Sequence, residues 1–360
     1  MPQNPFVKME EDKIFMRRCI QLALNAIDTA APNPMVGAVV VHEGKIIGEG
    51  WHRKAGEPHA EPNAIHSVKN QELLKKSTLY VSLEPCSHYG KTPPCADLII
   101  EKQIPRVVIG CEDPFSEVSG RGIRKLQDAG IEVIVGVEKE ACLQLNRSFI
   151  TFHQKKRPYI TLKWAQSLDG KIDTIRNSPQ TPALQISDDF SSLLVHKLRH
   201  ESDAIMVGSN TAVLDNPSLS VRNWPSSRKP IRIVLDSQGK LPSDATLLDG
   251  SAKTLIFTQK EQNSAKDNCQ WIQGNNLEDI MQELHQRGIQ RLLVEGGRRL
   301  HQSLIDKGLW DEIRIETAPW KIGPGVEAPQ LNISPENSHH FVCRETITCS
   351  GHKIQHIFKP

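Results

Sequence analysis

One histidine, one glutamate and two cysteines form the pattern that most constrains this chain. The stretch PHAEPNAI holds His59 and Glu61, and LEPCSHYGKTPPC holds Cys86 and Cys95. Zinc binds imidazole nitrogen and thiolate sulfur in a tetrahedron, and a catalytic zinc site leaves one position for water. His59 precedes one expected helix and Cys95 begins another, where the positive helix end favours a thiolate. We therefore expect His59, Cys86 and Cys95 to bind a zinc ion.

Glu61 follows His59 by two residues and is expected to be catalytic, moving protons rather than binding the metal. Zinc deaminases need such a carboxylate when hydroxide attacks the amine-bearing ring carbon, and their signature is H-x-E followed by P-C-x-x-C. The first half of that signature is present, whereas eight residues, not two, separate Cys86 from Cys95. The pattern predicts a deaminase of an amino-substituted heterocyclic ring, with an enlarged loop between the cysteines.

Two alternatives to a catalytic zinc site stay open. A structural zinc site would need a fourth protein ligand, which His52, His66 or His88 could supply. Cysteines nine positions apart are also common without any metal, so Cys86 and Cys95 carry weight only together with the histidine and the glutamate.

Three polar residues are expected to contact a substrate in this half of the chain. Asn33 lies between two prolines in APNPMVGAVV, a rigid position from which an amide can contact a ring edge. Lys91 lies in the enlarged loop, where a cation could meet a phosphate, although a solvated surface lysine is the plain alternative. His52 is the third expected contact.

The length and the local pattern predict two α/β domains. A chain of 360 residues exceeds what one hydrophobic core usually serves. Short β-branched runs alternate with helix-like stretches, which is typical of α/β layers. The polar stretch QKKRP favours a boundary within 148–157, between a domain at 1–150 and one at 157–360. The expected strands are 36–41, 45–50, 78–83, 106–110, 132–137, 203–208, 230–236, 254–258, 291–297 and 311–319.

Composition argues against several function classes. The 44 basic and 42 acidic side chains leave a net charge of +2, and only 5% of residues are aromatic, which disfavours a nucleic-acid-binding track. We find no apolar stretch of the length that a membrane span or a signal peptide needs. The eight cysteines are scattered, so we expect reduced thiols and a cytoplasmic protein.

Several longer motifs resemble one enzyme family along nearly the whole chain. PNPMVGAVVV, GEPHAE, LEPCSHYGKTPPC and GRGIRKLQDAGIEV are similar to the deaminase half of the bifunctional riboflavin-biosynthesis deaminase–reductases. PYITLKWAQSLDGK, SNTAVLDNPSLSVR, PIRIVLDS and LLVEGGRRL are similar to the reductase half. The enlarged loop between the cysteines is also what this family carries.

The resemblance implies two consecutive reactions and two folds. A cytidine-deaminase-like N-terminal domain would use zinc to deaminate 2,5-diamino-6-(5-phosphoribosylamino)pyrimidin-4-one. A dihydrofolate-reductase-like C-terminal domain would then use NADPH to reduce the ribosyl group to ribityl. The family also suggests a homodimer formed through the C-terminal domain. The alternative is a zinc deaminase of another base or nucleoside with a degenerate C-terminal half.

The resemblance also carries reductase residues over by position. Arg199 and Arg222 suit a substrate phosphate, since guanidinium groups pair with it bidentately. The EGG stretch after an expected strand lets backbone approach a pyrophosphate at a helix start. Lys163 is expected to be catalytic and to pair with Glu295 near the nicotinamide. The implied cofactor contacts are Ala165, Gln185, Thr211, Asp215, Ser237, Gly297, Arg298, Arg299 and Leu300, and the implied substrate contacts are Ala183, Arg199, Leu219, Arg222 and Glu295.

One departure from the family pattern concerns the reductase. The family carries Ser-x-Trp-Ile where this chain reads PALQIS, so Ala183 and Gln185 stand in for the serine and the tryptophan. The substitutions remove a hydroxyl and an aromatic face from the cleft in which the cofactor and the substrate are expected to meet.

Overall fold

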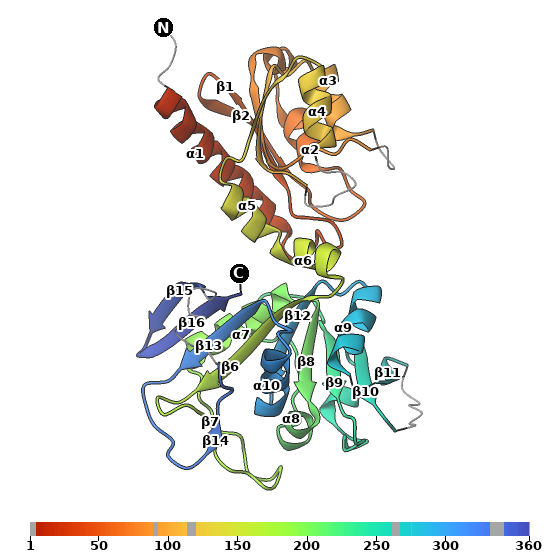
Figure 1. Ribbon diagram of the computed structural model, residues 1–360, viewed down its shortest axis with the longest axis vertical. Coiled ribbons are helices and arrows are strands. Elements are labelled where there is room, and N and C mark those ends of the chain that lie inside the picture. The colour runs from red at the N-terminus through yellow and green to blue at the C-terminus, as the bar shows by residue number, and fades with distance from the viewer. Residues whose placement is uncertain are drawn as a thin grey trace. The chain divides into compact units, whose positions relative to one another are not determined.

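The computed structural model describes residues 5–88, 93–113, 120–260, 267–274, 276–331 and 342–359. The chain divides into two compact units, residues 1–155 and 156–360 (Figure 1). Each unit is a sheet with helices packed against it, so the expected two-domain α/β class is confirmed. In the described part of the chain no helix is both long enough and apolar enough to cross a bilayer.

The first unit is built on a five-stranded mixed sheet in the order β2-β1-β3-β4-β5. β1 runs antiparallel to β2 and β3, whereas β3, β4 and β5 are parallel to one another. The strands are β1 (Gly37–His42), β2 (Lys45–Trp51), β3 (Thr78–Leu83), β4 (Arg106–Cys111) and β5 (Glu132–Val135). The helices are α1 (Pro5–Ala23), α2 (Ala60–Ser67), α3 (Cys95–Glu101), α4 (Arg121–Asp128), α5 (Lys139–Leu145) and α6 (Arg147–Lys155).

Both faces of this sheet are covered, which explains the unbroken apolar run in β1. Ala38 and Val40 pack with α2, α3 and α4 on one face, and Val39 and Val41 pack with α1 and α5 on the other (Figure 1). A strand that alternates between two buried faces needs apolar residues at every position rather than at every second one. The sheet is therefore the centre of a three-layer unit.

Two glycines in β2 allow α2 to lie directly against the sheet. A Cβ at Gly48 would lie 2.5 Å from the carbonyl oxygen of Ala64, and one at Gly50 would lie 2.3 Å from the Ala64 nitrogen. Any larger residue at either position would push α2 outward. This contact fixes where the helix begins, and the expected metal ligand His59 is the residue just before it.

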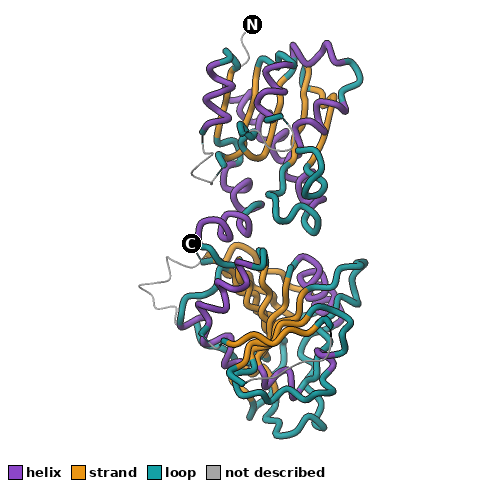
Figure 2. The backbone as a smooth tube through the Cα atoms, turned by 90° about the vertical axis from the view of Figure 1, so that its right-hand side faces the viewer, coloured by secondary structure: helices purple, strands orange, loops and turns teal. Residues whose placement is uncertain are grey.

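The second unit contains a nine-stranded sheet in the order β11-β10-β9-β8-β12-β6-β13-β16-β15. Figure 2 shows the strands of this twisted sheet in orange. Neighbours from β11 to β13 are parallel, and β16 and β15 add an antiparallel edge. The strands are β6 (Tyr159–Gln166), β8 (Ala204–Gly208), β9 (Ile231–Leu235), β10 (Thr254–Thr258), β11 (Cys269–Gln273), β12 (Arg291–Gly296), β13 (Glu312–Thr317), β15 (Val342–Cys349) and β16 (His352–Phe358), with a separate pair β7 (Lys171–Asp173) and β14 (Val326–Glu327).

Helices cover both faces of this sheet as well. Met206 of β8 packs in the cluster that includes α9 and α10, and its neighbours Ile205 and Val207 pack in the cluster that includes α7 and α8. Parallel strands joined by helical crossovers place their carboxyl ends at one edge, where helices also begin. The helices are α7 (Asp189–Glu201), α8 (Ser209–Leu214), α9 (Leu277–Gln286) and α10 (Arg298–Asp306).

A buried ionic network ties α1 to the sheet of the first unit. Arg106 of β4 donates to both carboxylate oxygens of Asp12, at 3.0 and 2.7 Å, and the Tyr80 hydroxyl donates to Asp12 at 2.7 Å. All three residues are buried. Burial and the Asp12 carboxylate raise the pKa of Tyr80, so the phenol stays protonated and keeps its role as a donor.

We expect Asp12→Ala to destabilise the first unit by about 3–5 kcal/mol, because the substitution leaves a buried guanidinium without its counter-charge. Denaturant titration measures the loss in the free energy of unfolding, and hydrogen exchange shows whether that loss lies in α1 and β4. Glu10→Ala, which removes an exposed pair with Lys13 from the same helix, is the control and should leave the midpoint in place. A midpoint equal to that of the wild-type chain in the Asp12 variant would contradict the role of the network.

Candidate active sites

The three expected zinc ligands meet at the ends of three secondary-structure elements. His59 is the N-cap of α2, Cys86 follows β3, and Cys95 is the first residue of α3. The Nδ1 atom of His59 lies 3.6 Å from the Cys86 sulfur and 3.4 Å from the Cys95 sulfur. All three ligand atoms lie within 4.8 Å of one another. One imidazole nitrogen and two sulfurs at this spacing fit a zinc ion that keeps a fourth position for water.

A structural zinc site would need a fourth protein ligand, and among the residues that the structure describes none joins His59, Cys86 and Cys95. His52, His66 and His88 are absent from the group of ligand atoms around His59. The His52 ring nitrogens bond to Asn33 and Pro58 instead, and His66 and His88 are exposed. The geometry thus favours the catalytic type of site over the structural type.

The two sulfurs of the ligand group differ in how readily each loses its proton. The hydrogen bond from the Cys95 thiol, helped by His59, lowers the pKa of Cys86 to about 4. The backbone N–H of Cys95, at the start of α3, also donates to the Cys86 sulfur at 3.3 Å. The arrangement therefore stabilises a thiolate at Cys86, and a coordinated metal removes the remaining proton from such a pair.

Glu61 lies in the first turn of α2, where its side chain is buried beside the sulfurs. Burial raises the pKa of Glu61 to about 7, and the negative charge of Cys86 contributes in the same direction. A carboxyl group with a pKa near neutrality can both accept and release a proton at physiological pH. That property is what the sequence pattern assigned to this residue.

Asn33 and His52 form one hydrogen-bonded unit near the ligand group. The His52 Nδ1 atom lies 3.1 Å from the Pro58 carbonyl oxygen, so Nδ1 donates and Nε2 is left to accept. The Asn33 amide nitrogen donates to that Nε2 atom at 3.0 Å. The bond orients the Asn33 amide, and the rings of His52 and His59 lie 5.4 Å apart. Lys91, the third expected substrate contact of this unit, lies outside the described residues.

Two positioning residues of this site were missed from the sequence. Glu84 accepts hydrogen bonds from the backbone N–H groups of Asp113, Gly120, Gly122 and Ile123 at 2.9–3.3 Å. Its carboxylate thus joins the turn that carries Cys86 to the start of α4. Asn146 pairs through its amide with both the N–H and the C=O of Met35, at 2.8 and 2.9 Å, and so holds the loop that carries Asn33. Long-range backbone bonds of this kind leave no local sequence signal.

The second unit has a large cleft at the carboxyl ends of its parallel strands. Its volume is about 1390 Å³. Gly297, with φ +83°, links β12 to α10, and a Cβ at Gly296 would lie 2.7 Å from the Thr211 side chain. Two basic residues, Arg298 and Arg299, begin α10. A helix start that follows glycines and carries arginines suits a phosphate-bearing ligand. Residues expected to contact the cofactor line this cleft: Ala165, Gln185, Thr211, Asp215, Ser237, Gly297, Arg298, Arg299 and Leu300.

The expected substrate contacts of the second unit are more scattered. Glu295 lines the cleft, but its carboxylate is paired with Arg199 through two bonds of 2.6 Å. The Arg199 guanidinium is therefore engaged by Glu295 and by the Ser220 carbonyl oxygen, and its contact with a substrate phosphate stays a prediction. Arg222 is exposed and keeps only a 3.2 Å side-chain bond to Ser218 among the described residues.

Lys163 lies beside Glu295 without bonding to it. No hydrogen bond or ion pair joins Lys163 to Glu295 within the described ranges, so the expected pair is replaced by the Arg199–Glu295 pair. Lys163 still lines the cleft, and burial lowers its pKa. Leu219 is buried in the loop between α8 and β9 at φ +48°, and Ala183 is exposed and is not among the residues that line the cleft.

Comparisons with known proteins agree with both sites. Residues 9–111 match the cytidine and deoxycytidylate deaminase zinc-binding region, and residues 158–348 match the RibD C-terminal domain. Riboflavin biosynthesis protein RibD of Aquifex aeolicus is 41% identical over 97% of this chain and 99% of its own length. The chain belongs to the RibD family. The RibD of Escherichia coli is 34% identical over 92% of this chain and 99% of its own length.

Solved RibD structures extend over both units. A diaminohydroxyphosphoribosylaminopyrimidine deaminase/5-amino-6-(5-phosphoribosylamino)uracil reductase of Thermotoga maritima covers 98% of this chain and 100% of its own, with TM-score 0.88 and 35% identity. RibD of Acinetobacter baumannii covers 98% of this chain and 99% of its own, with TM-score 0.86 and 31% identity. This RibD chain thus combines a cytidine-deaminase-like zinc domain with a dihydrofolate-reductase-like domain that uses NADPH, as the sequence motifs implied.

We expect Glu84→Ala to weaken zinc binding by about 10–100-fold, because residues that hold the ligand-bearing turn act on the metal through its ligands. Competition with a chelator of known affinity measures the change in the full chain. Glu101→Ala removes an exposed carboxylate of α3 that pairs with Lys102, and it serves as the control. Equal zinc affinity in both variants would show that Glu84 does not support Cys86.

Proposed function

We propose that this RibD chain carries out two consecutive reactions on one pyrimidine. The first unit hydrolyses the C2 amine of 2,5-diamino-6-(5-phosphoribosylamino)pyrimidin-4-one to give the uracil analogue and ammonia. The second unit transfers hydride from NADPH to the ribosyl group of that product. The observation that carries the proposal is the buried Glu61 carboxyl beside one imidazole and two thiols at zinc-ligand spacing.

Deamination needs an activated water and a group that moves protons. A zinc ion held by His59, Cys86 and Cys95 would supply a water of lowered pKa. Glu61 accepts a proton from the attacking water and delivers it to the departing amine, so that ring N=C–NH₂ and H₂O become ring HN–C=O and NH₃. A carboxyl with a pKa near 7 suits both transfers. Asn33, whose amide His52 orients, is proposed to contact the ring edge, and Lys91 the phosphate.

Reduction needs the cofactor and the sugar to meet in the cleft of the second unit. Thr211, Asp215, Ser237 and the start of α10 are proposed to bind NADPH, because they line the cleft around the glycine turn. Lys163, at the end of the cleft near Glu295, is the proposed proton donor. The step converts ribosyl, NADPH and one proton into ribityl and NADP⁺. Arg222, which is exposed, is the proposed phosphate contact, while Arg199 orders Glu295.

Domain limits, assembly and location complete the proposal. We assign the deaminase to residues 1–150 and the reductase to residues 157–360, on the strength of the two matched regions. The family resemblance supports a homodimer formed through the C-terminal domain. It also supports a cytoplasmic enzyme, as do the free cysteines among the described residues.

Incubation with the diaminopyrimidinone ribosyl phosphate tests both halves, with products identified by mass. We expect the uracil analogue without NADPH and the ribityl product with it. A chain that stops at the uracil analogue in the presence of NADPH has a reductase disabled by the changes at Ala183 and Gln185. The absence of any product from zinc-replete protein would refute this substrate and leave a deaminase of another base or nucleoside, which cytosine, cytidine and guanine would then test.

We expect Glu61→Gln to abolish ammonia release while zinc stays bound, because an amide keeps the shape of the carboxyl group but cannot exchange the proton. Loss of about 10²–10⁴-fold in deamination rate is the range for a general acid–base residue. Metal analysis of the same sample and its rate of reducing the uracil analogue are the internal controls. Wild-type turnover in this variant would contradict the assignment of Glu61 as the group that transfers protons.

A further inference from the structure

A second group of buried polar side chains lies beneath α7 in the reductase unit. Glu316 of β13 accepts a hydrogen bond from the Ser187 hydroxyl at 2.5 Å, and its other oxygen lies 2.9 Å from Nδ1 of His352 on β16. Glu316 and His352 are both buried. Asp188, the N-cap of α7, brings a carboxylate oxygen within 4.8 Å of both. Neither the deamination nor the reduction step derived above uses this group.

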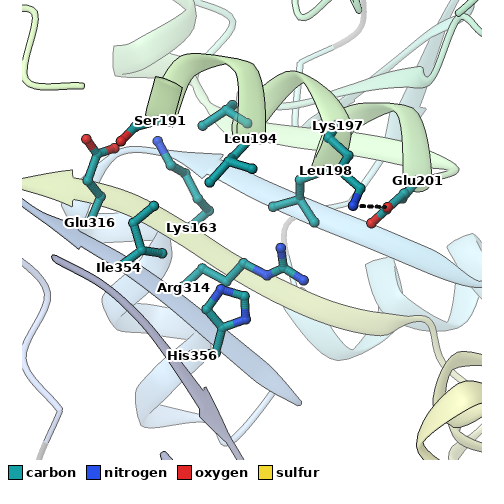
Figure 3. A pocket seen from close by; sticks show the side chains of 11 residues that line it. Lys163, Ser191, Leu194, Lys197, Leu198, Glu201, Arg314, Glu316, Ile354 and His356 are labelled. Carbon is teal, nitrogen blue, oxygen red and sulfur yellow. Dashed lines mark ion pairs between the residues drawn. The ribbon is translucent and has the colours of Figure 1, made fainter. Parts of the chain in front are cut away.

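The strand register places Glu316 on the same side of the sheet as Lys163. Lys163 of β6 is aligned with Arg314 of β13, and Glu316 lies two residues further along that strand. Side chains two apart in a strand share a face. All three residues line a cavity of about 240 Å³ under α7. In Figure 3 the Lys163 side chain points toward the end of α7 that carries Ser191, the end toward which the Glu316 carboxylate also points.

Other carboxylates near this cavity already have cationic partners. Glu295 is paired with Arg199, Glu312 with Arg314, and Glu201 with Lys197. The partner of Glu316 is His352, which is charged only when it is protonated. The charges of Glu295 and Glu316 both favour the protonated form of Lys163 against the burial that lowers its pKa. Glu316 and the half-buried Asp188 beside it are thus the nearby carboxylates that pair with no arginine or lysine in the part of the chain that the structure describes, and of the two Glu316 is the one that lines the cavity with Lys163.

Glu316 also holds one wall of the cofactor cleft. Its partner Ser187 lines that cleft together with Leu184, Gln185 and Ile186. This segment is where the chain departs from the Ser-x-Trp-Ile pattern of its family. The Gln185 side chain donates to the Ser187 carbonyl, and the Leu184 N–H donates to Asp173, so the segment is held by polar bonds at both ends.

We propose that Glu316 is a positioning residue of the reductase, which serves as counter-ion to the Lys163 ammonium and anchors the 184–187 wall through Ser187. Lys163 lines both the small cavity and the large cleft, so a charge held in the cavity acts on a group at the cleft. The inference rests on the proposed reductase function and adds a residue to it that the family motifs do not supply.

The reduction step alone tests this role, with the deaminated substrate supplied to the full zinc-loaded chain. The amide of Glu316→Gln removes the charge but can still accept the bond from Ser187, so the 184–187 wall stays anchored. We therefore expect kcat for reduction to fall by about tenfold, a modest share of what general acid–base groups contribute, with the NADPH KM changed less than twofold. Glu201→Gln is the control, since it removes a carboxylate that lines the same cavity but pairs with Lys197. Thermal unfolding of each variant reports whether the reductase unit is folded.

A double-mutant cycle with Lys163→Met separates positioning from general structural damage. If Glu316 acts through Lys163, Glu316→Gln has no further effect on single-turnover reduction in the Lys163→Met background. Additive losses, or a rate in Glu316→Gln equal to the wild-type rate, would overturn the inference. A second metal equivalent in the wild-type chain that is lost from Glu316→Gln would also overturn it, because Asp188, Glu316 and His352 would then be a metal site. No reduction by the wild-type chain would overturn the reductase assignment itself.

Discussion

The meeting of strand ends and helix starts is the constraint on which both sites depend. Parallel strands deliver their carboxyl ends to one edge, and the helices that follow them begin there with unpaired N–H groups. In the first unit this edge collects the start of α2, the turn after β3 and the start of α3, which carry the three zinc-type ligands. In the second unit it collects the starts of α8 and α10 around the cleft. In our proposal the same backbone geometry serves a cation in one unit and an anionic cofactor in the other, since the side chains differ.

Buried charge is the second theme that the two units share. Each functional carboxylate lies in a low-dielectric setting where a missing partner is costly, and its behaviour follows from the partner it has. Burial and the negative charge of Cys86 raise the pKa of Glu61 to about 7, although His59 beside it acts in the opposite direction. Arg199 lowers the pKa of Glu295 and keeps that carboxylate ionised. Glu84 accepts hydrogen bonds from backbone N–H groups at the start of α4. Glu316 differs from all three of these residues. Its partners are a hydroxyl group and an imidazole, so its negative charge can act on Lys163.

The sequence indicated the candidate ligand and catalytic residues better than the residues that hold them in position. His59, Glu61, Cys86 and Cys95 were found because each pair lies within a short stretch, and the cofactor-lining residues because family motifs carry them. Glu84, Asn146 and Glu316 were not singled out as functional, since their partners lie on elements distant in the chain. The helix α1 was also not expected, because Asp12 and Met16 face the sheet only through tertiary packing. The expected Lys163–Glu295 pair was replaced for the same reason: Arg199 approaches Glu295 from α7, which local pattern does not encode.

The sequence by itself determined the fold class, the ligand types and the family, since periodicity, ligand spacing and motifs are local properties of the chain. Only the tertiary structure explained Gly48 and Gly50, which are required because α2 lies against β2. The tertiary structure alone decided which charges meet. The register between β6 and β13 aligns Lys163 with Arg314 and places Glu316 on the same face of the sheet. The packing of α7 brings Arg199 into an ion pair with Glu295. Electrostatic partners depend on distances of a few ångströms between elements far apart in sequence, and folding alone sets those distances.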